Sequence, residues 1–217
     1  MSETPPSPAR PILHSPLYAI LDAEQLKGRS PSSVLQALLQ GGVSIIQLRV
    51  KNLPAKDFLD LAREAREQTR AHNCLLIVND RVDIALAAQA DGVHLGQEDL
   101  PLQAARKLMG SKLIGVSTHD LKQARGAEQG GADYIGFGPI FGTNTKQTGY
   151  APRGVAMLQE IRRAVSLPIV AIGGITEANV AQVWQSGADA AAMISDLLHA
   201  KDVAGKVKRI VSLHRDQ

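Results

Sequence analysis

The feature that most constrains the fold of this chain is a regular alternation of short apolar runs with longer amphipathic stretches. The short runs are rich in valine, isoleucine and leucine, and the stretches between them carry apolar residues at helical spacing. This alternation is typical of β/α units arranged around a parallel sheet. Eight runs predict strands: LYAIL (17–21), SIIQL (44–48), LLIV (75–78), GVHL (92–95), LIGVS (113–117), YIGF (134–137), IVAI (169–172) and AAAMI (190–194).

The number of units selects the fold. Eight units of roughly 25 residues each suit a small (β/α)8 TIM barrel, and they fill the 217 residues of the chain. The last helix is expected over residues 201–214. A doubly wound open sheet is the competing fold, but it does not require eight evenly spaced strands, and no GxGxxG motif follows the first run. We therefore predict an α/β protein with a single catalytic barrel over residues 16–217.

The first predicted helix has sequence signals at both ends. Ser30 and Pro31 have the residue types preferred at an N-cap and at the first helical position. Gly41 and Gly42 follow the periodic stretch, as expected where a helix stops. A helix is therefore expected between these two pairs.

The composition argues against several kinds of partner. A net charge of +3 and 3% aromatic residues supply neither a basic stripe nor a set of stacking rings, so no nucleic acid is expected. Residues 1–15 contain four prolines among polar residues, which predicts a flexible tail and no signal peptide. No segment resembles a membrane span, and a cytoplasmic protein is expected. The one cysteine, Cys74, starts an apolar run and is expected to be a buried thiol.

Polar side chains gather where the predicted strands end. In a (β/α)8 barrel the active site lies at the carboxyl ends of the strands, so these positions are the candidates for function. In chain order they are Gln47, Arg49 and Lys51; Asn79 and Asp80; Gln97, Glu98 and Asp99; Ser117; Gly173 and Gly174; and Ser195.

The loop after the sixth run, GPIFGTNTK (138–146), combines glycines, threonines and a lysine. Glycine lets the backbone approach an anion, threonine hydroxyls donate hydrogen bonds and lysine adds charge, so the loop suits an oxyanion such as phosphate. The segments AIGGIT and MISD follow the seventh and eighth runs, where phosphate sites of this fold are common. The alternative is that Gly173 and Gly174 only form a tight turn.

Two carboxylates, Asp80 and Asp99, follow neighbouring predicted strands without a nearby histidine or cysteine ligand. Ligands that offer only oxygen suit Mg²⁺, which keeps several waters and is often completed by substrate phosphates. A metal ion shared with a diphosphate would also explain the cations Arg49, Lys51 and Lys146. The alternative is that the two carboxylates cap the helices that follow them.

Seven segments carry a family resemblance: IIQLRVK, LIVND, GVHLGQEDLP, GVSTHD, GPIFGTNTK, AIGGI and MIS. In this order and spacing the chain resembles the thiamine-phosphate synthases from about residue 17 to residue 200. The resemblance implies a transferase of thiamine biosynthesis that joins two small molecules, an aminopyrimidine methyl diphosphate and a thiazole phosphate. The products would be thiamine phosphate and pyrophosphate.

The resemblance also implies roles for individual residues. Mg²⁺ would be held by Asp80 and Asp99. The residues expected at the pyrimidine diphosphate are Gln47, Arg49, Lys51, Asn79, Ser117 and Lys146, of which Arg49, Lys51, Ser117 and Lys146 would act in catalysis. Those expected at the thiazole phosphate are Thr143, Thr145, Gly174, Ile194 and Ser195.

Some features depart from the resemblance or stand outside it. Gly142 takes the place of a frequent proline, and Asp196 that of a frequent small residue; we expect the Asp196 side chain to point away from the phosphate. His94 alternates with apolar residues and is expected inside the barrel, while His119 is expected at its rim.

Two other functions remain as alternatives. One is a thiazole tautomerase, which would not need the diphosphate and metal residues. The other is a non-catalytic barrel that binds a phosphorylated ligand. The sequence leaves the oligomeric state open, including a homo-oligomer.

Overall fold

The structure, a computed structural model, describes residues 15–143 and 149–215. The eight expected strands are all present, and they form a closed parallel barrel in sequence order, β1 to β8. The prediction of a (β/α)8 barrel is therefore confirmed. The tail expected over residues 1–15 lies almost wholly outside the described residues, as do Thr145 and Lys146.

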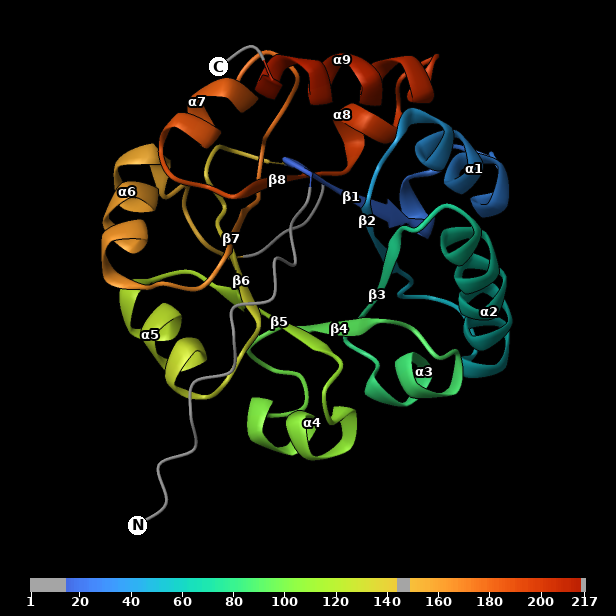
Figure 1. The fold of residues 1–217 in the computed structure, drawn as a ribbon, viewed down its shortest axis with the longest axis horizontal. Helices are drawn as coiled ribbons and strands as arrows, with labels where there is room; N and C mark the ends of the chain where they lie inside the picture. Colours follow the sequence, from blue (N-terminus) through green and yellow to red (C-terminus); the bar gives the residue numbers. More distant parts are fainter. Residues whose placement is uncertain (1–14, 144–148, 216–217) are drawn as a thin grey trace.

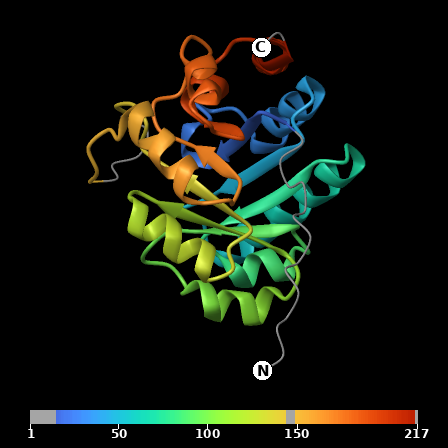
Figure 2. The ribbon, with the colours of Figure 1, turned by 60° about the vertical axis from the view of Figure 1, so that its left-hand side comes forward.

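The strands are short, and helices lie outside their ring (Figure 1). The view turned by 60° shows the same arrangement from the side (Figure 2). The strands are β1 (Leu17–Asp22), β2 (Ile45–Arg49), β3 (Leu75–Asn79), β4 (Gly92–Leu95), β5 (Leu113–Thr118), β6 (Tyr134–Phe137), β7 (Ile169–Ala171) and β8 (Ala190–Met193). The helices are α1 (Pro31–Gly41), α2 (Ala55–Ala71), α3 (Val82–Ala87), α4 (Leu102–Met109), α5 (Leu121–Gln129), α6 (Gly154–Ala164), α7 (Val180–Gln185), α8 (Ser195–Leu198) and α9 (Val203–Arg215), with a 3-10 turn η1 (Ala23–Gln25).

The ends of α1 follow the expected signals. The Ser30 side chain accepts a hydrogen bond from the backbone N–H of Ser33, and Pro31 is the first helical residue. Gly42 ends the helix in the left-handed conformation with a φ of 91°. Two short elements were not expected: the 3-10 turn η1 directly after β1, and α8, a single turn directly after β8 and ahead of the predicted last helix.

Side chains alternate between two cores. Ile46 and Leu48 of β2 face outward into the large core between the strands and the helices, whereas Ile45 faces the barrel interior with Tyr18 and Tyr134. Such alternation follows from the two-residue repeat of a strand. It sends every second residue of each strand towards the barrel axis, and the last of these inward residues reach the site described below.

Cys74 is buried at 2% exposure, as expected, and burial raises the pKa of its thiol to about 12. Within residues 15–143 and 149–215 no helix is long and apolar enough to span a membrane.

Because the barrel interior is tightly packed, we expect Gly115→Ala to destabilise the protein strongly. A Cβ at Gly115 on β5 would lie 2.1 Å from Cζ of the buried Tyr134 ring. Because neither the strand nor the ring has room to move, Gly115→Ala should lower the free energy of unfolding by about 1–3 kcal/mol in urea denaturation. Gly126→Ala is the control, because Gly126 lies in α5 with open space at its Cβ position. An equal loss in both variants would contradict this account.

Candidate active site

A cleft with two connected halves opens at the carboxyl ends of the strands. One half is lined by residues of β1 to β4 and by Val170 of β7, and the other mainly by the segments that follow β6, β7 and β8. The two halves share a largely apolar middle: Ser117, Gly136, Ile172, Ala192 and Ile194. Ligands bound in the two halves would therefore meet at these shared residues. Ser117 is the shared residue with a polar side chain.

The first half contains four of the residues predicted at the pyrimidine diphosphate: Gln47, Arg49, Asn79 and the shared Ser117. Gln47 and Arg49 both point inward from β2, since they are two residues apart on one strand. The Arg49 guanidinium donates to Asp22 Oδ2 at 2.6 Å, and its side chain is 13% exposed. Asp22, at the end of β1, therefore holds the arginine in place while leaving part of it accessible.

Lys51, Asp80 and Asp99 lie together at the rim beside Asn79. Lys51 forms an ion pair with Asp80. Burial raises the pKa of Asp99, and a hydrogen bond with the Asp80 carboxyl raises it further. Asp99 Oδ2 also accepts a hydrogen bond from the N–H of Gly96 at 2.6 Å. The sequence therefore correctly predicted that these two carboxylates would be neighbours.

The alternative that the two carboxylates are helix caps is wrong. The cap residue of α3 is Arg81 and that of α4 is Pro101, and neither helix has a side-chain cap hydrogen bond. The donor set instead fits a hard divalent cation, because two carboxylates face each other and a bound cation would relieve their mutual repulsion. Within the part of the chain that the structure describes, no group of three or more His, Cys, Asp or Glu residues could hold a metal.

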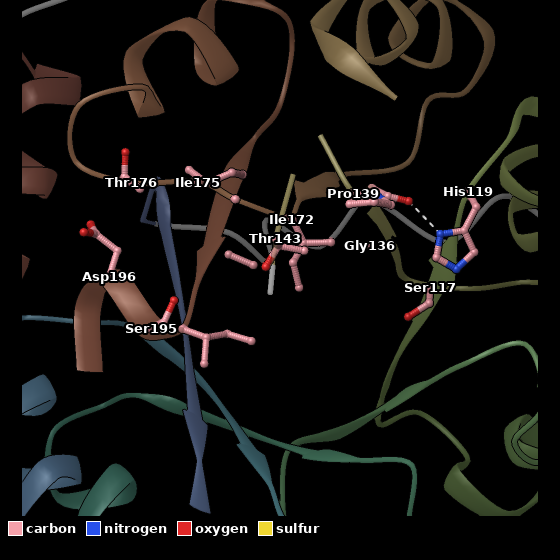
Figure 3. Close-up of a pocket in the computed structure, with 15 residues that line it drawn as sticks. Ser117, His119, Gly136, Pro139, Thr143, Ile172, Ile175, Thr176, Ser195 and Asp196 are labelled. Atoms are coloured by element: carbon pink, nitrogen blue, oxygen red, sulfur yellow. Dashed lines mark hydrogen bonds between the residues drawn. The ribbon is translucent and has the colours of Figure 1, made fainter. Parts of the chain in front are cut away.

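The second half of the cleft is built from loops (Figure 3). Thr143, Gly174 and Ser195 line it, with Ile194 at the boundary of the two halves. Gly173 and Gly174 have φ values of 101° and 63°, and a Cβ at Gly174 would lie 2.4 Å from the Gly142 carbonyl oxygen. The tight turn considered above is thus present, and it also lines the cleft. Backbone hydrogen bonds from Ile140 to Ile172 and from Phe141 to Gly173 join this turn to the loop after β6.

Asp196 lines the same half, but its charge is already compensated. One carboxylate oxygen pairs with Lys206 at 2.8 Å, and the other accepts a hydrogen bond from the N–H of Glu177 at 3.0 Å. In Figure 3 its carboxylate points away from Ser195 and Ile172. Asp196 therefore ties α8 to the loop after β7, and its orientation relative to a bound phosphate stays a prediction.

The two histidines lie where the sequence predicts. His94 is 9% exposed inside the barrel. His119 lines the rim, and its Nδ1–H donates to the carbonyl of Gly138 at 2.6 Å (Figure 3). His119 also stacks on Tyr150, with ring centroids 3.9 Å apart.

Sequence reasoning missed three polar residues of the site: Asp22, Tyr18 and Tyr134. Tyr18 and Asp22 belong to the inward row of β1, and Tyr134 begins the inward row of β6. The sequence pattern that could have identified them is their two-residue spacing from other inward positions. The two tyrosines, however, stand in apolar runs and resemble ordinary core residues.

Comparisons with known proteins show the family of the chain. A family model described as thiamine monophosphate synthase matches residues 17–197. The thiamine-phosphate synthase of Chloroflexus aurantiacus is 47% identical over 197 residues, covering 91% of each chain. That of Halalkalibacterium halodurans is 48% identical over 190 residues, covering 87% of this chain and 90% of the relative.

Solved structures show the same relationship. The thiamine phosphate pyrophosphorylase of Pyrococcus furiosus superposes with a TM-score of 0.85 at 36% identity, covering 92% of this chain and 95% of that one. A 3-hexulose-6-phosphate synthase from Salmonella typhimurium reaches a TM-score of 0.73 at 20% identity over 92% of this chain and 98% of that one, and it shares the fold alone. The chain therefore belongs to the thiamine monophosphate synthase family and is a transferase with thiamine-phosphate synthase activity.

Proposed function

We propose that the chain joins an aminopyrimidine methyl diphosphate to a thiazole phosphate, each bound in one half of the cleft. The single observation that carries this proposal is the two-part cleft with a shared apolar middle. Its first half adjoins cations and carboxylates, and its second half is lined by glycine backbone and hydroxyl groups. A bimolecular reaction gains most from such a site, because holding two rings in contact removes the entropic cost of their encounter.

The diphosphate would bind at the rim of the first half. Arg49 and Lys51 would neutralise its charge, and Asp22 would keep the Arg49 guanidinium oriented through their hydrogen bond. Asn79 would add an amide donor beside them. Lys146 remains a predicted member of this group and lies outside the described residues.

Asp80 and Asp99 would hold Mg²⁺ at the same rim. When bound, the cation would supply charge neutralisation for a departing pyrophosphate. Lys51, which pairs with Asp80 in this structure, would then be available to the diphosphate.

The second half would take the thiazole phosphate. The backbone of Gly174 and Ile194 and the hydroxyls of Thr143 and Ser195 line this half, and they suit the oxygens of a phosphate monoester. Thr145 is predicted to join them and lies outside the described residues.

For this reaction the protein needs mainly to neutralise the charge of the leaving pyrophosphate and to align the two rings. The bond between the pyrimidine methylene carbon and the diphosphate oxygen breaks, and its electron pair leaves with pyrophosphate. The electron-rich aminopyrimidine stabilises the positive methylene carbon, and the thiazole nitrogen then donates its lone pair to form the new C–N bond. The attacking nitrogen carries no proton, so we assign no general base.

The first experiment combines both substrates with the purified protein and Mg²⁺ and detects thiamine phosphate and pyrophosphate. We expect both products, in equal amounts, and their loss when a chelator is added. Absence of product from folded protein would instead favour the tautomerase or the ligand-binding barrel.

The carboxylate pair predicts a loss of turnover on neutralisation. Asp80→Asn and Asp99→Asn should each lower kcat by about 100-fold or more and weaken the dependence on Mg²⁺. Asparagine is the appropriate replacement at position 80, because Asp80 has a φ of 63°, which asparagine tolerates. Asp83→Asn is the control, since Asp83 pairs with Arg81 on the surface with a side chain 64% exposed. Full activity in both site variants would remove the metal assignment.

The hydroxyl of Ser195 predicts a selective effect on one substrate. Ser195→Ala should raise KM for the thiazole phosphate about tenfold, because one hydrogen bond to a charged group is lost. KM for the pyrimidine diphosphate should stay within about twofold of the original. Steady-state kinetics with each substrate varied in turn measures both, with Ser212→Ala on the exposed face of α9 as control. Equal changes for both substrates would contradict the division of the cleft.

A further inference from the structure

A continuous row of hydrogen bonds, here called the relay, crosses the barrel interior beneath the cleft. It begins at Gln47 on β2 and ends at Ser117 on β5, two residues that line the first half of the cleft. Three buried side chains connect them: Tyr18, Tyr134 and His94. The distances are 3.0 Å from Gln47 Nε2 to Tyr18 Oη, 2.9 Å between the two tyrosine oxygens, 3.1 Å from Tyr134 Oη to His94 Nδ1, and 2.9 Å from His94 Nε2 to Ser117 Oγ.

The connecting rings are held rigidly. Tyr18 and Tyr134 are 1% and 0% exposed, and the ring of His94 lies 5.5 Å from that of Tyr134, centroid to centroid. Glycines provide the space for these rings. A Cβ at Gly136 would lie 3.0 Å from His94 Cε1, and a Cβ at Gly115 would lie 2.1 Å from Cζ of Tyr134. Burial raises the pKa of both tyrosines well above the ordinary value. Each phenol therefore keeps its single hydrogen at neutral pH.

The Gln47 end of the relay determines the direction of every hydrogen bond in the relay. The amide nitrogen of Gln47 can only donate, so Tyr18 accepts there and gives its own hydrogen to Tyr134. Tyr134 then donates to Nδ1 of His94. The histidine consequently carries its hydrogen on Nε2 and donates it to Ser117. Any break in this order would leave a buried hydroxyl hydrogen without an acceptor, which is costly inside a barrel.

We propose that Tyr18, Tyr134 and His94 are positioning residues that fix which hydrogen-bonding groups the cleft presents to the pyrimidine. Gln47, with its amide nitrogen bound to Tyr18, presents Oε1 as an acceptor. Ser117, whose oxygen accepts from His94, directs its hydrogen into the cleft as a donor. The two ends of the chain are thus coupled, although they lie on strands that do not pair with each other.

This proposal rests on the proposed function and names the chemical feature selected by its pyrimidine half. An aminopyrimidine offers an amino group that donates to Gln47 Oε1 and a ring nitrogen that accepts from Ser117. The corresponding oxo compound replaces the amino donor with an acceptor, which would face the Gln47 oxygen. A site that leaves its buried polar groups unpaired rejects such an analogue strongly. The relay therefore makes the site specific for the amino over the oxo ring.

The first test does not depend on activity. Protein labelled with ¹⁵N-histidine is studied by long-range ¹H–¹⁵N correlation NMR, which distinguishes the two histidine tautomers. The His94 signals are identified by their loss in His94→Gln. We expect hydrogen on Nε2 in the original protein and a mixture of tautomers in Tyr134→Phe, which removes one oxygen and keeps the ring. The matched control is Tyr150→Phe, since Tyr150 stacks on His119 outside the relay.

Two results would overturn the relay. The first is hydrogen on Nδ1 of His94 in the original protein, which would reverse the direction of the chain. The second is an unchanged His94 tautomer in Tyr134→Phe. Neither result requires turnover, so failure of the relay can be distinguished from failure of the proposed function.

The second test is a double-mutant cycle with Ser117→Ala and Tyr134→Phe. Tyr134→Phe alone should lower kcat/KM for the aminopyrimidine diphosphate roughly tenfold and reduce the preference over the oxo analogue, with KM for the thiazole phosphate unchanged. In the Ser117→Ala background, the same substitution should cost clearly less than tenfold, because the part of its effect that passes through Ser117 is already lost and only the part that passes through Gln47 is left. If Tyr134 had a purely structural role, the losses of kcat/KM in the two single variants would multiply in the double variant, and both substrates would be affected. That outcome would also overturn the proposal.

Discussion

The structure depends on one geometric constraint, the closure of eight parallel strands into a barrel whose side chains alternate inward and outward. Closure leaves no free strand edge in the barrel and gives each strand a single inward row. On β2 that row is Ile45, Gln47 and Arg49, which runs from the apolar interior to the charged rim. A polar side chain placed two residues beyond a core residue therefore reaches the cleft.

The same alternation explains why the charged groups of the rim come in pairs. Neighbouring strands end together, so Asp22 on β1 lies opposite Arg49 on β2 in the strand register. Lys51 and Asp80 follow β2 and β3 in the same way and form the second pair. Each of these two cations, Arg49 and Lys51, is thus oriented by a carboxylate. In the proposed reaction, this preorganisation would stabilise a leaving diphosphate.

Much of the fold and part of the site could be predicted from the sequence. The eight apolar runs correspond to the eight strands, because strand formation here follows local periodicity. The neighbouring positions of Asp80 and Asp99 followed from strand order alone. The short helix α8 was missed, since one turn of four residues has no periodic signal. Whether Asp80 and Asp99 cap helices also stayed open, because capping depends on where the backbone places each carboxylate.

The sequence by itself determined the number of units, the inward and outward faces of each strand and the residue types at the strand ends. These properties are local, since they follow from the two-residue repeat of a strand and from the side chains themselves. Only the tertiary structure decided which inward residues meet. Tyr18 and Tyr134 are 116 residues apart in the chain, yet their hydroxyl groups lie 2.9 Å apart, because barrel closure brings β1 and β6 to a common interior. A contact of this kind has no local signal, so two residues that resemble plain core in the sequence connect the two ends of a polar relay in the structure.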